Sequence, residues 1–179
     1  MKIWRVIADI NNFERLIESS QSNKVSLRDF IGKSLLDSWV KPNLVVINEK
    51  GRLKRGDCPY FGILVFSIFA IEILNDLMKD CVELLGIDCD SGNYKIINLI
   101  NVVDCLDYSK SVIQRYDDGE RISNIKKYAF IPEKIFNQNI FVIPERPRSP
   151  VFVSNEFKNR VLESGLKGFK FEEIWDSNE

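Results

Sequence analysis

The apolar residues of this chain fall into short runs separated by turn-forming residues, which limits it to short buried elements. The longest run, from Phe61 to Leu74, has only fourteen residues and contains Glu72, whereas a helix needs about 20 apolar residues to span a bilayer. The chain has 179 residues, and compact domains usually have about 100–200. We therefore expect a single domain over residues 1–179 that does not contact a membrane.

Two segments have the pattern of an amphipathic helix. In Ser67–Lys79, apolar residues recur at three- and four-residue spacing after a serine that can cap the helix N-terminus. Ser154–Ser164 also begins with a serine and places Phe157 and Val161 on one face. Gly165 follows, and it suits the left-handed residue of a Schellman ending. We expect these two segments to be the main helices.

The other apolar runs have the length and the flanking turn residues of strands. Strands outnumber helices and the two do not alternate regularly, which favours an α+β domain with a mostly antiparallel or mixed sheet over a doubly wound parallel sheet. The predicted strands are Lys2–Ala8, Asn43–Ile47, Val82–Ile87, Tyr94–Val103, Ile140–Ile143 and Phe169–Glu172.

A hairpin is predicted within residues 111–130. Asp118 and Gly119 can adopt the positive φ values of a tight primed turn, which suits two antiparallel strands. Ile122 and Ile125 are out of phase for one strand face. The second half of the hairpin therefore needs either a bulge or a short helical turn.

The chain contains no histidine, which excludes Ser-His-Asp triads, Cys-His dyads and the usual zinc-hydrolase sites. It has neither a G-x-G-x-x-G motif nor a P-loop. Its N-terminus lacks the apolar stretch of a signal peptide. We expect a cytoplasmic protein that is not an enzyme and has no cofactor and no metal site. Its cysteines form no C-x-x-C pair, and the last three lie in or beside apolar runs as core residues would: Cys58, Cys81, Cys89 and Cys105.

Charge is unevenly distributed although the formal net charge is only −1. Residues 41–57 carry a net charge of +3 and residues 104–120 a net charge of −3. An acidic loop can steer a basic protein partner, since binding residues concentrate on loops. The candidate partner-binding residues are Asp104, Asp107, Asp117, Asp118 and Glu120.

Two other functions stay open at this point. A nucleic-acid-binding module would use the basic segment 50–55 together with Arg146 and Arg148. A carboxylate-based hydrolase would need two acidic side chains that converge in a pocket. The neighbouring acidic pairs in the sequence are Asp88/Asp90, Asp104/Asp107, Asp117/Asp118 and Glu172/Glu173.

Several segments resemble one family, the bacterial immunity proteins of polymorphic-toxin systems first catalogued as a domain of unknown function. The resemblance extends over nearly the whole chain and implies a cytoplasmic antidote that binds and neutralises a cognate secreted toxin domain, without catalysis. Nucleases are the commonest toxins in such systems, and an acidic surface would fit their basic clefts. The segments are residues 1–4, 54–59, 101–107, 115–119, 141–145, 152–158 and 165–171, with Trp175.

Overall fold

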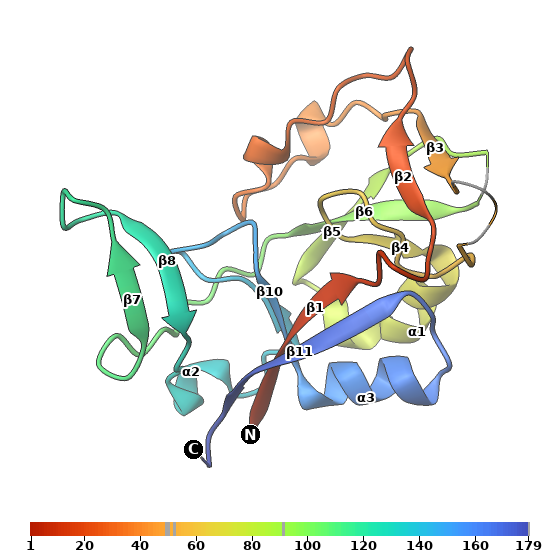
Figure 1. Ribbon diagram of the computed structural model, residues 1–179. Helices are drawn as coiled ribbons and strands as arrows, with labels where there is room; N and C mark the ends of the chain where they lie inside the picture. The colour runs from red at the N-terminus through yellow and green to blue at the C-terminus, as the bar shows by residue number, and fades with distance from the viewer. Residues whose placement is uncertain (49–50, 52, 91, 179) are drawn as a thin grey trace.

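The structure, a computed structural model, describes residues 1–48, 51, 53–90 and 92–178. Its largest sheet has the strand order β11-β1-β10-β9 and is antiparallel throughout (Figure 1). The first strand of the chain therefore lies between two strands from its C-terminal part. The bounds are Lys2–Ala8 for β1, Ile140–Phe141 for β9, Val151–Ser154 for β10 and Phe169–Asp176 for β11.

Three smaller antiparallel sheets surround this one: the order β4-β6-β5, the ribbon β2-β3 and the hairpin β7-β8. The α+β class with mostly antiparallel sheets is thus confirmed. The bounds are Arg15–Glu18 for β2, Leu44–Ile47 for β3, Val65–Ser67 for β4, Val82–Gly86 for β5, Tyr94–Leu99 for β6, Val112–Arg115 for β7 and Ile122–Lys127 for β8.

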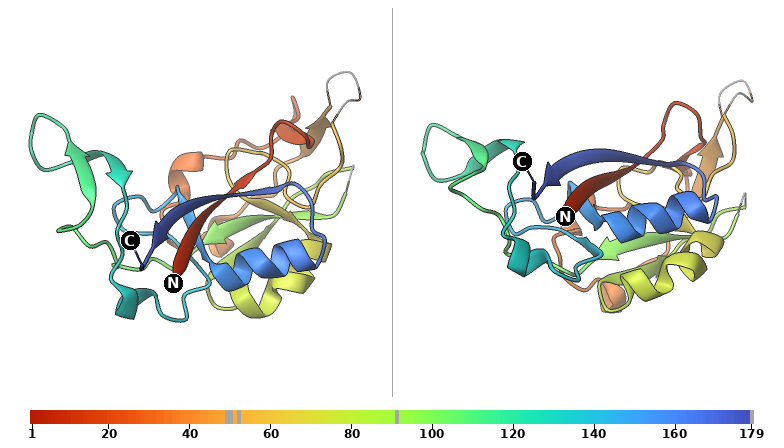
Figure 2. Two further views of the ribbon diagram at one scale, coloured as in Figure 1. Left: turned by 60° about the horizontal axis from the view of Figure 1, so that its bottom comes forward. Right: turned by 90° about the horizontal axis from the view of Figure 1, so that it is seen from below.

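The two main helices are α1 (Ile68–Met78) and α3 (Asn155–Glu163), and they lie side by side (Figure 2). Each begins as predicted: the side-chain oxygen of Ser67 accepts from the Ala70 N–H at 3.0 Å, and that of Ser154 accepts from the Phe157 N–H at 3.1 Å. The shorter helices are α2 (Pro132–Ile135) and the 3₁₀ turns Leu27–Asp29 and Leu36–Ser38. No helix in the described part of the chain is long and apolar enough to cross a bilayer.

The C-terminal end of α3 has the predicted Schellman geometry. Gly165 has a φ of +68°. Its N–H donates to the carbonyl of Leu162 at 3.2 Å, and the Leu166 N–H donates to the carbonyl of Val161 at 3.2 Å. Val161 and Leu166 are both buried in the same cluster, so the chain reverses directly into β11.

Strand β10 of the largest sheet is buried on both faces, which explains its continuous apolar run. In β10, Val151 and Val153 pack with α1 and α3, whereas Phe152 between them packs into a second cluster beneath the β7-β8 hairpin. Ile3 and Val6 of β1 divide between the two clusters in the same way. Successive side chains of a strand point to opposite faces, so each apolar run contributes to two cores.

Several strand boundaries differ from the prediction. β6 ends at Leu99, because the N–H groups of Ile100 and Asn101 both donate to the Cys81 carbonyl and the chain turns toward β9. β11 continues to Asp176 through an irregularity opposite Ile3 and Trp4. The prediction missed β2 and β10, which have only four residues each and therefore give weak periodic patterns.

The segment before β4 connects the start of α1 to the turn before β11. The carboxylate of Asp57 accepts from the Ser67 hydroxyl at 2.7 Å and from the Lys167 N–H at 2.9 Å. Gly168 has a φ of +86°, and a Cβ there would lie 3.2 Å from the Cys58 carbonyl oxygen. Residues 56–58 and 167–168 are therefore packed backbone against backbone, which explains why these motifs contain glycine.

Candidate functional site

Residues 112–127 form the predicted hairpin, which extends away from the body of the protein (Figure 1). We call these residues the hairpin arm and residues 116–121 its tip. At the tip, the Tyr116 N–H donates to the Arg121 carbonyl at 2.9 Å and the Gly119 N–H donates to the Tyr116 carbonyl at 2.9 Å. The register shifts twice between β7 and β8, so of the two alternatives for the second strand the bulge is confirmed.

The turn itself differs from the predicted primed type. Of its two central residues only Gly119 has a positive φ, +72°, whereas a type I′ turn needs positive values at both. The carboxylate of Asp118 accepts from the N–H groups of Glu120 and Arg121, each at 3.0 Å. This side-chain bonding closes the wider loop, and the prediction of a tight two-residue turn was wrong for that reason.

Three of the five candidate acidic residues lie at the tip. Asp118 is committed to the turn and also pairs with Arg121 at 2.6 Å, which lowers the pKa of its carboxyl. Asp117 and Glu120 are exposed. Tyr116 is 54% exposed, and the Arg121 guanidinium lies 5.2 Å from its ring centroid. The tip therefore presents two acidic side chains beside an aromatic ring.

Asp104 and Asp107 lie at the base of the arm. The Asp107 N–H donates to the Ala129 carbonyl, and the Asp107 carboxylate accepts from the Ser109 hydroxyl at 2.6 Å. That bond lowers the pKa of Asp107. Asp104 pairs with Lys134 of α2 at 3.3 Å. Strand β7 lies between this base and the tip and is about 10 Å long, at roughly 3.4 Å per residue. The five acidic residues therefore form two groups.

The arm also brings basic residues close to these acids. Residues 104–120 are net acidic, but residues 104–127 contain five acidic and five basic side chains. The basic side chains that follow Glu120 in the sequence balance the acids: Arg121 at the tip, and Lys126 and Lys127 in β8. The negative charge is therefore a property of the tip and not of the whole arm.

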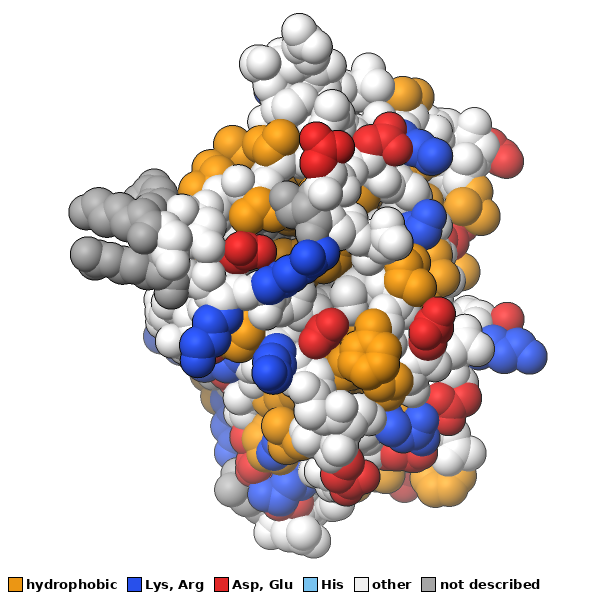
Figure 3. All heavy atoms as spheres, turned by 90° about the vertical axis from the view of Figure 1, so that its right-hand side faces the viewer, with side chains coloured by type: hydrophobic (Ala, Val, Ile, Leu, Met, Phe, Trp, Pro, Cys, Tyr) orange, Lys and Arg blue, Asp and Glu red, His pale blue; other side chains and the backbone are white. Residues whose placement is uncertain are grey.

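The basic residues considered for nucleic-acid binding belong to two separate segments of the chain, residues 50–55 and residues 146–148. Lys50 and Arg52 lie outside the described residues. Arg55 donates to the Tyr94 hydroxyl at 3.4 Å beside the start of α1, and Arg146 donates to the Ser123 carbonyl of β8 at 2.5 Å. On the side that carries α1 and β3, basic, acidic and hydrophobic side chains are interspersed (Figure 3). Arg55 and Arg146 therefore each have a protein acceptor, on different segments of the chain.

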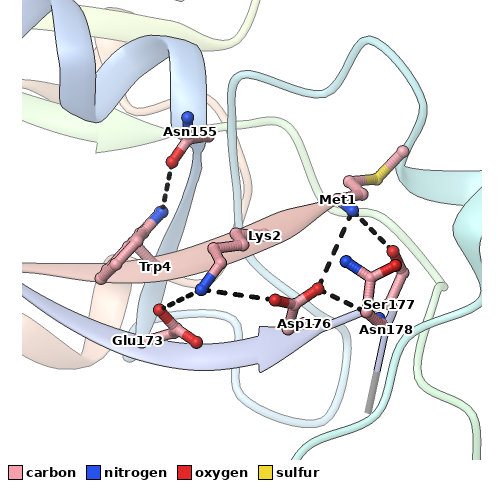
Figure 4. Close-up of polar contacts among 8 residues, drawn as sticks. All are labelled: Met1, Lys2, Trp4, Asn155, Glu173, Asp176, Ser177 and Asn178. Carbon is pink, nitrogen blue, oxygen red and sulfur yellow. Dashed lines mark hydrogen bonds and ion pairs between the residues drawn. The ribbon is translucent and has the colours of Figure 1, made fainter.

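The acidic pair Glu172/Glu173 does not converge on a pocket. The carboxylate of Glu173 pairs with Lys2 at 2.9 Å, whereas that of Glu172 pairs with Arg5 at 3.3 Å. Lys2 also contacts Asp176 at 3.3 Å near the meeting point of the two chain ends (Figure 4). Among the residues with described positions, no group of three or more Cys, Asp or Glu side chains could hold a metal ion.

The cysteines are free thiols in or near the core. Cys58 and Cys105 are fully buried, and Cys81 and Cys89 are partly buried. Burial raises the pKa of the Cys105 thiol to about 12 and that of Cys58 further still. Both buried thiols are therefore protonated at neutral pH and unreactive as nucleophiles.

The model of an immunity protein family, Imm11, matches residues 82–176. The match begins at β5 and includes the hairpin arm, α3 and β11, while β1 to α1 lie before it. A search of curated proteins finds no match. Since the matched residues make up more than half of the 179, this chain belongs to the Imm11 immunity protein family.

Proposed function

We propose that this protein protects the cell that makes it by binding a cognate toxin domain in the cytoplasm and blocking it sterically and electrostatically, without catalysis. Family membership supports a toxin-neutralising role. Binding needs a rigid scaffold and a complementary surface, and it needs no imidazole, metal or cofactor. The absence of histidine from the sequence agrees with such a mechanism.

The observation that carries this proposal furthest is the geometry of the hairpin arm. Its two strands are anchored: Ile113, Ile122 and Ile125 pack into the cluster beneath them. Its tip is exposed from Tyr116 to Arg121. An anchored element with an exposed tip can enter a concave site at little entropic cost, because its backbone is already ordered.

The candidate partner-binding residues have unequal roles in this proposal. Asp117 and Glu120 are exposed and would face the toxin directly. Asp118 shapes the loop, while Asp104 and Asp107 hold the base of the arm and would act through its position. A basic cleft, such as the phosphate-binding cleft of a nuclease, is the surface that the tip would complement best.

Charge reversal at the tip tests this proposal. In the variant Asp117→Lys/Glu120→Lys, association with the cognate toxin domain should slow about tenfold at low salt and less at high salt, since screening weakens steering between exposed charges. The thermal midpoint should stay unchanged. Stopped-flow or biosensor kinetics at two salt concentrations would measure this.

The matched control is Glu72→Lys/Glu163→Lys, which makes the same change in net charge at exposed positions on α1 and α3. Its association rate should stay close to that of the wild type. An equal loss in both variants would assign the effect to net charge alone. An unchanged rate in the tip variant would remove the tip from the interface.

A further inference from the structure

A groove of about 400 Å³ lies beside the end of β1, away from the hairpin tip. The end of β1, the loop before β4 and the residues leading into β10 line it, and these segments meet near the centre of Figure 1. Its apolar lining includes Val6, Leu64 and Val151, which are buried. Tyr60 and Ile10, 46% and 39% exposed, also line it. The volume is in the range of ligand sites, about 300–1,000 Å³.

One edge of β1 is open at this groove. Pairing with β10 ends at Val6 and Val151, whereas pairing with β11 continues to Ala8 and Phe169. Among the described residues, Ile7 and Ala8 therefore have a strand neighbour only in β11. The Asp9 N–H donates to the Gly168 carbonyl on that side, and the Ala8 carbonyl accepts from the Ile10 N–H at 3.1 Å, which leaves the Ala8 N–H on the open side. A free N–H at the end of a strand can donate a hydrogen bond to an extended segment of another chain.

Positive charge converges on the groove from three segments. Arg5 of β1, Arg148 before β10 and Lys170 of β11 line it, and Asp9 is the one acidic residue in its lining. The Asp9 carboxylate accepts from the Asn11 N–H at 3.2 Å and from the Asn12 amide at 2.8 Å, so it is committed to its own turn.

The three cations are only partly neutralised by neighbouring groups. A single carboxylate, that of Glu172, contacts both Arg5 at 3.3 Å and Lys170 at 3.9 Å. Arg5 Nε is buried and has no hydrogen-bond acceptor in the described part of the chain. Arg148 is exposed and donates to the Leu27 carbonyl at 3.3 Å. Positive charge therefore remains available to a ligand.

We propose that this groove binds an extended acidic segment of the partner protein, whose backbone accepts a hydrogen bond from the Ala8 N–H at the end of β1. Successive side chains of such a segment would alternate between the apolar lining and the cations Arg148 and Lys170. The groove would then provide a second contact with the toxin, opposite in charge to the hairpin tip. This inference rests on the proposed function for the identity of the partner.

The test reverses the two more exposed cations in Arg148→Glu/Lys170→Glu and measures affinity for the cognate toxin domain by calorimetry. We expect binding about tenfold weaker, since reversal replaces two favourable charge contacts by repulsive ones. Lys33→Glu/Lys54→Glu makes the same change in net charge at exposed positions outside the groove lining, and it should bind within about twofold of the wild type. Equal binding by the groove variant would overturn the inference and leave the proposed function intact.

A second measurement does not depend on the toxin. Fluorescence anisotropy would compare a labelled peptide of alternating leucine and glutamate with one of alternating leucine and lysine, and with a single-stranded oligonucleotide. The glutamate peptide should bind the wild type and lose about tenfold in affinity for Arg148→Glu/Lys170→Glu. Equal binding of both peptides, or tighter binding of the oligonucleotide, would overturn the inference. Failure of the wild type to bind the toxin would count against the proposed function alone.

Discussion

The C-terminal unit, residues 151–176, and the hairpin arm differ in what holds their side chains. In the unit, Val153 and Phe157 are fully buried and α3 packs against α1 and the sheet. In the arm, only Ile125 is buried in either strand, and the whole tip is exposed. Substitutions of the buried residues of the unit should therefore change the free energy of unfolding, while substitutions at the exposed tip should change binding. The comparison separates residues that maintain the fold from those free to contact a partner.

The largest expected effect is at the centre of the unit. Phe157→Ala should lower the free energy of unfolding by about 3–5 kcal/mol, because it removes a fully buried ring and leaves a cavity. For a chain of this size that corresponds to a fall of about 6–20 °C in the thermal midpoint. Calorimetry would measure it. A midpoint within about 1 °C of the wild type would show that the ring is exposed and would make it a candidate for binding.

Two glycines with similar backbone angles should respond differently in the two regions. Gly168 and Gly119 have φ values of +86° and +72°, but a Cβ would lie 3.2 Å from the Cys58 backbone only at Gly168 and would meet nothing within 4 Å at Gly119. Gly119→Ala should cost about 1 kcal/mol from backbone strain, and Gly168→Ala about 2–4 kcal/mol because the contact adds to the strain. Urea denaturation of both variants gives the comparison. Equal costs would mean that residues 56–58 yield without penalty.

The smallest effect concerns pH at the tip. The hydrogen bond from Arg121 holds the pKa of Asp118 below its ordinary value. Because this pKa is lower in the folded state, the ionised carboxylate stabilises the closed loop at pH values above the unfolded pKa of about 3.9. The stabilisation is lost as the pH falls through the folded pKa. In Arg121→Gln the Asp118 midpoint should rise, as a carbon-detected NMR titration would show, with the thermal midpoint unchanged at pH 7. An unmoved Asp118 midpoint would contradict the pairing.

The sequence predicted the elements whose signals are local. The serine caps, the helices α1 and α3 and the Schellman glycine depend on residues within a few positions of one another, and each lies where the pattern indicated. The hairpin was predicted for the same reason. Its turn type was not, because the bonding of the Asp118 carboxylate to two backbone N–H groups competes with the conformation that Asp118-Gly119 favours alone.

Tertiary structure decided which distant residues share a surface. Five acids that look like one patch in the sequence divide between the tip and the base of the arm, and basic residues of β8 lie beside them. The proposed groove has no signature in the sequence, because Arg5, Arg148 and Lys170 come together only when β1 pairs between β10 and β11. Local patterns fix helix ends and turns, since the interacting atoms are near neighbours. Strand pairing joins residues far apart along the chain, so its surfaces appear only in the folded protein.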